Sequence, residues 1–403
     1  MKADSVVDKI RCINDLNLFN KLLQDPKVIN TNDWIKRESK KNPRSIRRHL
    51  LSSSVRLTKR MSPKIHAMAE DCIEKLSVEM PLELFVYSSP QFNAACFKPE
   101  EERLYVMFSS SLLEGFSESE LKYVIGHELG HHVYNHHDIP IGYLLKGEQR
   151  PSPRMALELF AWSRYAEISA DRAGAHCAQD FHSVASALFK LSSGLTSDLI
   201  NFELDDFLEQ VEDMQIVNAS PGEHAPKEDW FSTHPFSPLR VRALQLFHES
   251  EFAKTSGISS TGLEVRVQQL MGLMEPDYMK GKTEVAEAMR RLLFAGAIAV
   301  AAVSGDISKK EIEVFEKFFG KGAFHDRLNI EKLVESVKER AEKVSNIASP
   351  AQCIQVMRDL ILISRADNRA MKAEINELNK IAKLLKISEP DLEMIFDQEY
   401  ELD

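Results

Sequence analysis

Apolar residues recur every three to four positions through most of the 403-residue chain, a spacing typical of amphipathic helices. Strand-like runs are few. Two short runs rich in β-branched and aromatic residues, LELFVY at 82–87 and RLYVMF at 103–108, are separated by a turn-rich segment, so we expect a hairpin or neighbouring strands. The pattern therefore predicts a mainly α fold of the α+β class with a small β-sheet.

Three further segments are predicted to be helical. Ser117 followed by Glu120 has the spacing of a capping box, so a helix should begin at Glu118. An alanine-rich segment without internal proline predicts a second helix over 155–178. The longest apolar run, 292–303, is well short of the ~20 residues that span a bilayer, and we expect a buried helix there.

Proline and polar residues mark the loops and divide the chain. They accumulate at 139–153 and 218–238, and a polar linker occupies 254–262. We predict three units, given by residue range as a basic helical lead-in at 1–62, a central α+β domain at 63–253 and an all-helical tail at 254–403.

The formal net charge of -10 argues against binding to nucleic acid, because a polyanion requires a basic surface. The segment 36–60 is the exception, since it is strongly basic and Glu38 is its only acid. It is either a solvated helix face or loop, or a patch that contacts an anionic membrane surface or an acidic partner protein.

The first residues alternate charged and apolar side chains and lack the apolar core of a signal peptide, which favours a cytoplasmic protein. The chain has five cysteines, without a C-x-x-C pair, and this number and spacing indicate reduced thiols.

The stretch VIGHELGHHVYNHH at 124–137 contains the strongest chemical signal. His127 and His131 are four residues apart, about 400° of helix rotation, so both imidazoles leave the same side of the helix within ~6 Å of axial rise. Glu128 can act on a water molecule at the same metal, as in the H-E-x-x-H zinc hydrolases. The alternative is a charged, exposed helix face. His132, His136 and His137 fall outside the ligand spacing, and we expect solvent contact or support roles for them.

Zinc needs a third protein ligand, and the predicted helix at 155–178 supplies a candidate. Glu167 would complete a set of two histidines and one carboxylate. Asp171, one turn later on the same face, could accept from the outer ring nitrogen of a ligating histidine and fix its tautomer. The alternative is a pair of surface acids beside Arg164 and Arg172. Two imidazoles and a carboxylate favour Zn²⁺ over other metals.

The central region resembles the gluzincin metallopeptidases that include HtpX, BepA and the CAAX prenyl proteases. The likeness runs roughly from Pro81 to Phe247 and rests on three motifs in order: VIGHELGHH, AEISADRAG and STHPFSPLRVRAL. It implies a gluzincin-type zinc protease domain, with His127, His131 and Glu167 as metal ligands.

The resemblance also implies Glu128 as the general base and Asp171 as the acid behind a ligand. His234 and Arg240 match the third motif, beside the active site. His234 is then expected to stabilise the oxyanion, to bind the metal when substrate is absent, or to be part of a structural turn. Membrane-embedded relatives carry transmembrane helices, whereas the connection at 139–153 is too short and proline-rich to be one, so membrane-embedded substrates are not expected.

The tail contains a weak internal repeat with an offset of 63 residues, 303–319 and 366–382, which aligns Glu311 with Glu374. The positions of a calcium loop would be Val300, Ala302 and Ser304, which lack the carboxylates that calcium requires. The repeats resemble TerB, the helical tellurite-resistance module, and this likeness suggests a docking or regulatory unit.

These features predict a zinc-dependent metalloendopeptidase that hydrolyses proteins or peptides, with zinc and Glu128 activating water. An exposed edge of the 103–108 strand is expected to pair with an extended substrate. The alternative is a catalytically silent or gated metal-binding module that acts through its tail.

Overall fold

The structure is a computed structural model that describes residues 6–41, 45–146, 151–196, 200–219, 232–274, 278–279, 284–303, 308–325, 328–366 and 371–397. Its contacts divide the chain into two compact units, one of Met1–Val211 with Phe231–Arg266 and one of Glu212–Trp230 with Val267–Asp403. Every helix among the described residues is too short or too polar to cross a bilayer.

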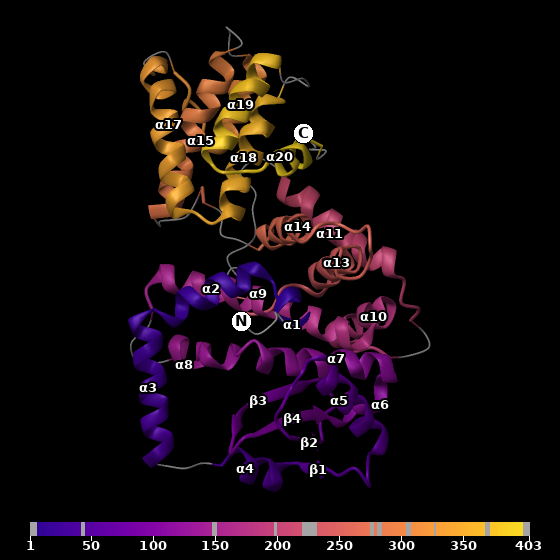
Figure 1. The fold of residues 1–403 in the computed structure, drawn as a ribbon. Helices are drawn as coiled ribbons and strands as arrows, with labels where there is room; N and C mark the ends of the chain where they lie inside the picture. Colours follow the sequence, from indigo (N-terminus) through magenta and orange to yellow (C-terminus); the bar gives the residue numbers. More distant parts are fainter. Residues whose placement is uncertain are drawn as a thin grey trace. The chain divides into compact units, whose positions relative to one another are not determined.

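The first unit contains a four-stranded sheet beside the long helix α7 (Figure 1). The strands are β1 (Val55–Leu57), β2 (Leu82–Tyr87), β3 (Ala94–Glu100) and β4 (Arg103–Ser109), in the order β1-β2-β4-β3. β2 and β4 run parallel, while β1 and β3 pair antiparallel with β2 and β4. The expected neighbouring strands are therefore present, with β3 at the edge.

The prediction that the 103–108 strand has an exposed edge for an extended substrate is wrong. β4 has hydrogen-bonded neighbours on both sides, so 103–108 has no free edge to offer a substrate. The accessible edge on that side of the sheet is β3. The sequence pattern did not predict this strand, because Lys98, Pro99 and Glu100 interrupt the alternation of apolar and polar residues.

The first unit contains twelve helices among the described residues, including the helix pair α7 and α9. They are α1 (Val6–Ile10), α2 (Ile13–Leu23), α3 (Pro26–Lys41), α4 (Ile46–Ser53), α5 (Pro63–Lys75), α6 (Ser110–Gly115), α7 (Glu118–Val133), the 3₁₀ helix η1 (His136–Asp138), α8 (Ile141–Lys146), α9 (Pro153–Ala178), α10 (Phe181–Ser193) and α13 (Ser237–His248). α11 (Leu204–Ala219) and α14 (Ser260–Gly272) each continue into the second unit.

Helix α7 begins at Glu118 as predicted. The Ser117 amide donates to the Glu120 carboxylate (2.7 Å), and the Glu120 amide donates to the Ser117 hydroxyl (3.4 Å). Together these bonds satisfy two of the amides that a helix start leaves free. Helix α9 starts at Pro153, two residues before the prediction, and ends at Ala178.

Small residues let α7 and α9 approach each other closely. A Cβ at Gly130 would lie 2.9 Å from the Cβ of Ala173 and 3.1 Å from the Cα of Ala170, and a Cβ at Gly126 would lie 2.8 Å from Cys177. These contacts are shorter than atoms tolerate, so the spacing of the two helices depends on glycine.

The second unit is all helical. It contains α15 (Glu284–Ala302), α16 (Lys309–Phe319), α17 (Ile330–Ile347), α18 (Pro350–Ser364), α19 (Lys372–Leu384) and α20 (Glu389–Asp397). The apolar run predicted at 292–303 lies in α15, which is largely buried in the core of this unit.

The two copies of the repeat have the same local geometry. Glu311 and Glu374 are both buried, and each accepts the backbone amide three residues before it, from Ser308 and Met371 (2.7 Å in both). The aligned acids therefore cap α16 and α19. The turns themselves, 304–307 and 367–370, which include Ser304 of the calcium test, lie outside the described residues.

Candidate metal centre

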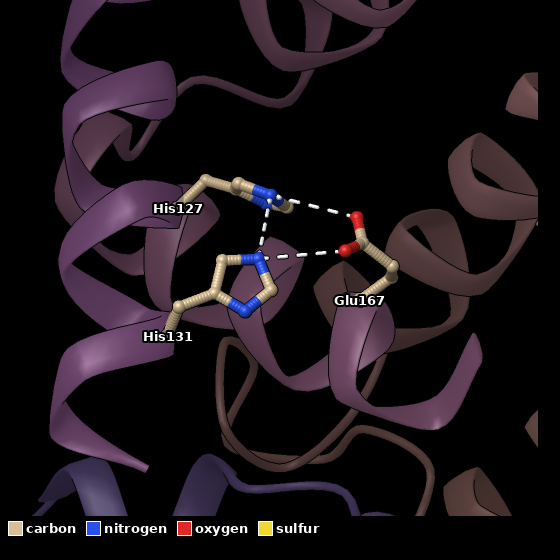
Figure 2. Close-up of side chains that lie close together, drawn as sticks. All are labelled: His127, His131 and Glu167. Carbon is tan, nitrogen blue, oxygen red and sulfur yellow. Dashed lines mark hydrogen bonds and ion pairs between the residues drawn. The ribbon is translucent and has the colours of Figure 1, made fainter. Parts of the chain in front are cut away.

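Two histidines of α7 and one glutamate of α9 converge on one point. His127 and His131 point from one helix toward Glu167 on the other (Figure 2). The two Nε2 atoms are 3.2 Å apart, and they lie 3.6 Å (His127) and 3.4 Å (His131) from the Glu167 carboxylate. Within the described residues this is the one group of histidine, cysteine and acidic side chains arranged to hold a metal.

The donor triangle fits zinc. Zinc–nitrogen bonds of about 2.05 Å in tetrahedral geometry place neighbouring donors roughly 3.3 Å apart. The two ring nitrogens are 3.2 Å apart, and each lies at a similar distance from a different oxygen of Glu167, His131 3.4 Å from Oε1 and His127 3.6 Å from Oε2. These residues supply three ligands, so a tetrahedral zinc ion held by them would keep a fourth position for a water molecule or a substrate.

Asp171 lies directly behind His127. Its Oδ1 is 2.9 Å from Nδ1 of His127 and also accepts from the hydroxyl of Tyr123 (2.7 Å). Two guanidinium nitrogens of Arg240 donate to the same carboxylate, one to Oδ1 (2.6 Å) and one to Oδ2 (2.8 Å). Because Nδ1 of His127 donates its proton here, the Nε2 lone pair is free to face Glu167.

Burial and neighbouring charges shift the pKa values of the residues around the triangle in different directions. Burial lowers the pKa of His131 well below its usual value, so its imidazole is neutral. Burial opposes ionisation of Asp171, but Arg240 and His127 outweigh it and hold the pKa of that carboxyl far below its usual range. The carboxylate therefore stays charged behind its ligand. At His127 burial lowers the pKa, but the bond to Asp171 and the charge of Glu167 outweigh it and raise the pKa.

Glu128 lies between α7 and the sheet edge. Its Oε2 accepts the backbone amide of Cys96 in β3 (2.7 Å). Burial raises the pKa of Glu128 above the usual value for a glutamate, which makes its carboxylate a stronger base than an exposed one. The base candidate is thus tied to the strand along which a substrate could lie.

The third motif lies next to Glu167. Nε2 of His234, in the turn before α13, is 3.5 Å from Oε1 of Glu167, and the His234 side chain is 64% exposed. Nη2 of Arg240 is 3.4 Å from the other carboxylate oxygen, Oε2. The structure therefore brings all seven predicted residues together, with His234 at the solvent-exposed rim.

Two neighbours, Tyr123 and Asp15, were not predicted from the sequence, and a third, His136, was expected to have solvent contact or a support role. Tyr123 stands one turn before His127 on α7, so the i, i+4 spacing could have indicated it. His136 is buried and hydrogen-bonded to His131, which is one of the support roles expected for the extra histidines. Asp15 carries no local signal, because its partner His136 is 121 residues away in sequence.

Comparison with known proteins extends the resemblance. Residues 59–146 and 153–247 match the model of peptidase family M48, and residues 290–396 match that of tellurite resistance protein TerB. The chain is 29% identical over 211 residues to the plastoglobule-localized metallopeptidase 48, chloroplastic, of Arabidopsis thaliana. The aligned region covers 50% of this chain and 61% of that protein.

Two shorter matches are to proteases named HtpX. The chain is 38% identical over 58 residues to protease HtpX of Shewanella halifaxensis (strain HAW-EB4) and to that of Shewanella frigidimarina (strain NCIMB 400), covering 14% of this chain and 20% of each protease. It thus spans less than two thirds of the length of these relatives. No solved structure gives a significant match. By these matches, the chain pairs a region similar to peptidase family M48 with a C-terminal region similar to TerB.

Proposed function

We propose that the protein is a zinc-dependent endopeptidase whose metal ligands are His127, His131 and Glu167. The observation that carries the proposal is the donor triangle of two imidazoles and one carboxylate, the donor set of zinc hydrolases, whose ligand atoms all lie within 4.8 Å of one another. Zinc bound there would lower the pKa of a water molecule and polarise the scissile carbonyl.

Glu128 is the general base of this proposal. It takes the proton of the attacking water and delivers it to the leaving amine. Its buried position and raised pKa support the first step, since a carboxylate with a raised pKa takes up a proton more readily. The bond from the Cys96 amide restricts the carboxylate to one orientation.

The substrate is a protein or peptide segment that pairs with β3. The Cys96 amide points away from β4, toward Glu128. Backbone groups alternate along a strand, so Ala94, two residues before Cys96, presents its amide and carbonyl on the same free side; the register shift between Phe97 and Glu100 ends this regular alternation. Pairing of this kind recognises the main chain of the substrate and not its side chains, which favours broad specificity.

Arg240 acts through Asp171, which it holds charged and oriented behind His127. His234 is close enough to Glu167 and exposed enough to meet a substrate carbonyl, and we assign it to stabilisation of the oxyanion. The TerB domain is assigned a docking or regulatory role.

The test compares Glu128→Gln with the wild type for zinc content and for cleavage of casein. The variant should bind one zinc per chain and lose at least about 10²-fold in activity, because general-base help is worth ~10²–10⁴-fold. Glu118→Gln is the matched control, since that acid lies on the same helix, is 65% exposed and pairs with Lys64; it should retain full activity.

Two outcomes contradict the proposal. Equal casein cleavage by both zinc-loaded proteins would remove Glu128 from the mechanism. Absence of cleavage by the zinc-loaded wild type, with zinc bound equally in both, would favour a silent or gated interaction module. His127→Ala should lose zinc as well as activity, which separates metal binding from proton transfer.

A further inference from the structure

Asp15 is a fully buried carboxylate on α2, in a part of the chain outside the match to family M48. Four side chains donate to it: Arg11 (2.8 Å), Trp162 (3.0 Å), Ser169 (2.8 Å) and His136 (3.1 Å). Burial alone raises the pKa of Asp15, but the bonds from His136 and Arg11 outweigh it and hold the pKa at about 2. The group is therefore a permanent anion.

This anion contacts the ligand helix α9 and the 3₁₀ helix η1 that follows the ligand helix α7. Trp162 and Ser169 belong to α9, and Ser169 stands two residues after Glu167. His136 follows α7 in the 3₁₀ helix η1 and is itself 5% exposed. The N-terminal helix α2 is thus bonded to α9, which carries Glu167, and to η1, which follows the helix that carries both histidines.

His136 connects Asp15 to the second histidine. Its Nδ1 is 2.9 Å from Nδ1 of His131. If Nε2 of His131 offers its lone pair to a metal, Nδ1 of that ring carries the proton and donates it, so Nδ1 of His136 must accept. The proton of His136 then sits on Nε2, facing the Asp15 carboxylate. Only this arrangement of protons satisfies the three residues at once.

We propose that Asp15, through His136, is a positioning device that fixes the tautomer and ring orientation of His131 for metal binding. The inference rests on the proposed zinc site. It gives each ligating histidine an anionic support: His127 meets Asp171 directly, and His131 reaches Asp15 through one intervening imidazole. A ligand supported in this way binds metal more tightly.

The direct test measures zinc affinity by competition with a chromophoric chelator. Asp15→Asn and His136→Phe should each weaken zinc binding about 10–100-fold. The matched control is His137→Gln, which changes the adjacent, half-buried histidine; its buried Nε2 has no hydrogen-bond partner among the described residues. That variant should bind zinc as tightly as the wild type.

Two further measurements separate positioning from general stability. Asp15→Asn should add no loss in the His136→Phe background, because the carboxylate acts only through that ring. His136→Asn, whose amide oxygen can stand near the place of Nδ1, should recover part of the affinity. The absorption spectrum of the Co²⁺-substituted protein should shift in the Asp15 and His136 variants and not in His137→Gln.

Failure of this proposal and failure of the zinc site give different results. Zinc affinity unchanged within twofold in Asp15→Asn and His136→Phe, while Glu167→Gln loses binding, would overturn the positioning role and leave the site intact. Zinc affinity unchanged in Glu167→Gln as well would overturn the site. Additive losses in the double variant would show that Asp15 acts on the fold and not through His136.

Discussion

Gly130, inside the H-E-x-x-H motif, controls how near the two ligand helices can come. A side chain there would meet the backbone of α9 at Ala170, three residues after Glu167, as well as the Cβ of Ala173. The distance from the histidines to Glu167 is therefore set by the absence of one methyl group.

The variant Gly130→Ala tests this spacing. Overpacking should destabilise the protein by about 1–3 kcal/mol, partly offset by the ~1 kcal/mol that alanine gains over glycine in a helix. Because α9 must move away, zinc affinity should fall as well, measurable by chelator competition. Gly142→Ala is the control, since a Cβ there meets no atom within 4 Å; zinc affinity equally weakened in that variant would contradict this account.

At the scale of elements, helix α7 is held at its start by a buried carboxylate. Glu120 accepts from the Ser117 amide (2.7 Å), the Ser186 hydroxyl (2.7 Å) and the Lys190 ammonium (2.8 Å). Burial raises the pKa of Glu120, but the bonds from Lys190 and Ser186 outweigh it and lower the pKa below its ordinary value of 4.5. The ionised form thus stabilises the fold.

This stabilisation should depend on pH. A carboxyl with a lowered pKa stabilises the fold fully above its ordinary value and loses that contribution as pH falls through the lowered one. Relative to Glu120→Gln, the wild type should be more stable by about 1–3 kcal/mol at pH 7, and the difference should shrink below about pH 4.5, measured by urea unfolding. The control is Glu118→Gln, at an exposed position near Glu120, which should change the free energy of unfolding by less than ~1 kcal/mol. A difference between wild type and Glu120→Gln that persists at pH 3 would contradict the role of charge.

Local patterns carried most of what the sequence predicted. The i, i+4 spacing and the capping box depend on residues a few positions apart, so the ligand pair, Glu128 and the start of α7 were accessible from the sequence. β3 was not, because Lys98 and Pro99 break the alternation of an edge strand. Asp15 was not, because only the tertiary fold brings α2 beside His136.

At the scale of the whole molecule, the chain has two compact units, and the donor triangle belongs to the first. A metal that binds only the folded state stabilises it by RT ln(1 + [L]/Kd), about 4 kcal/mol at a thousandfold excess over Kd. Metal binding should therefore act on one unit and not on the other.

Calorimetry can detect this difference. Zinc should raise the Tm of one transition, a chelator should lower it again, and the transition of the TerB-containing unit should not move. In His127→Ala both transitions should be insensitive to zinc. A zinc-dependent shift of the whole unfolding profile as a single transition would show that the units do not unfold separately.

The burial of α2 against α9 has a practical consequence for dissecting the protein. A fragment that began at residue 59, where the match to family M48 starts, would keep every predicted ligand and the general base. It would also lose Asp15, leaving Trp162, Ser169 and His136 without their shared acceptor; each buried polar group stranded in this way costs about 1–3 kcal/mol. An inactive minimal domain would therefore say little about the activity of the full chain.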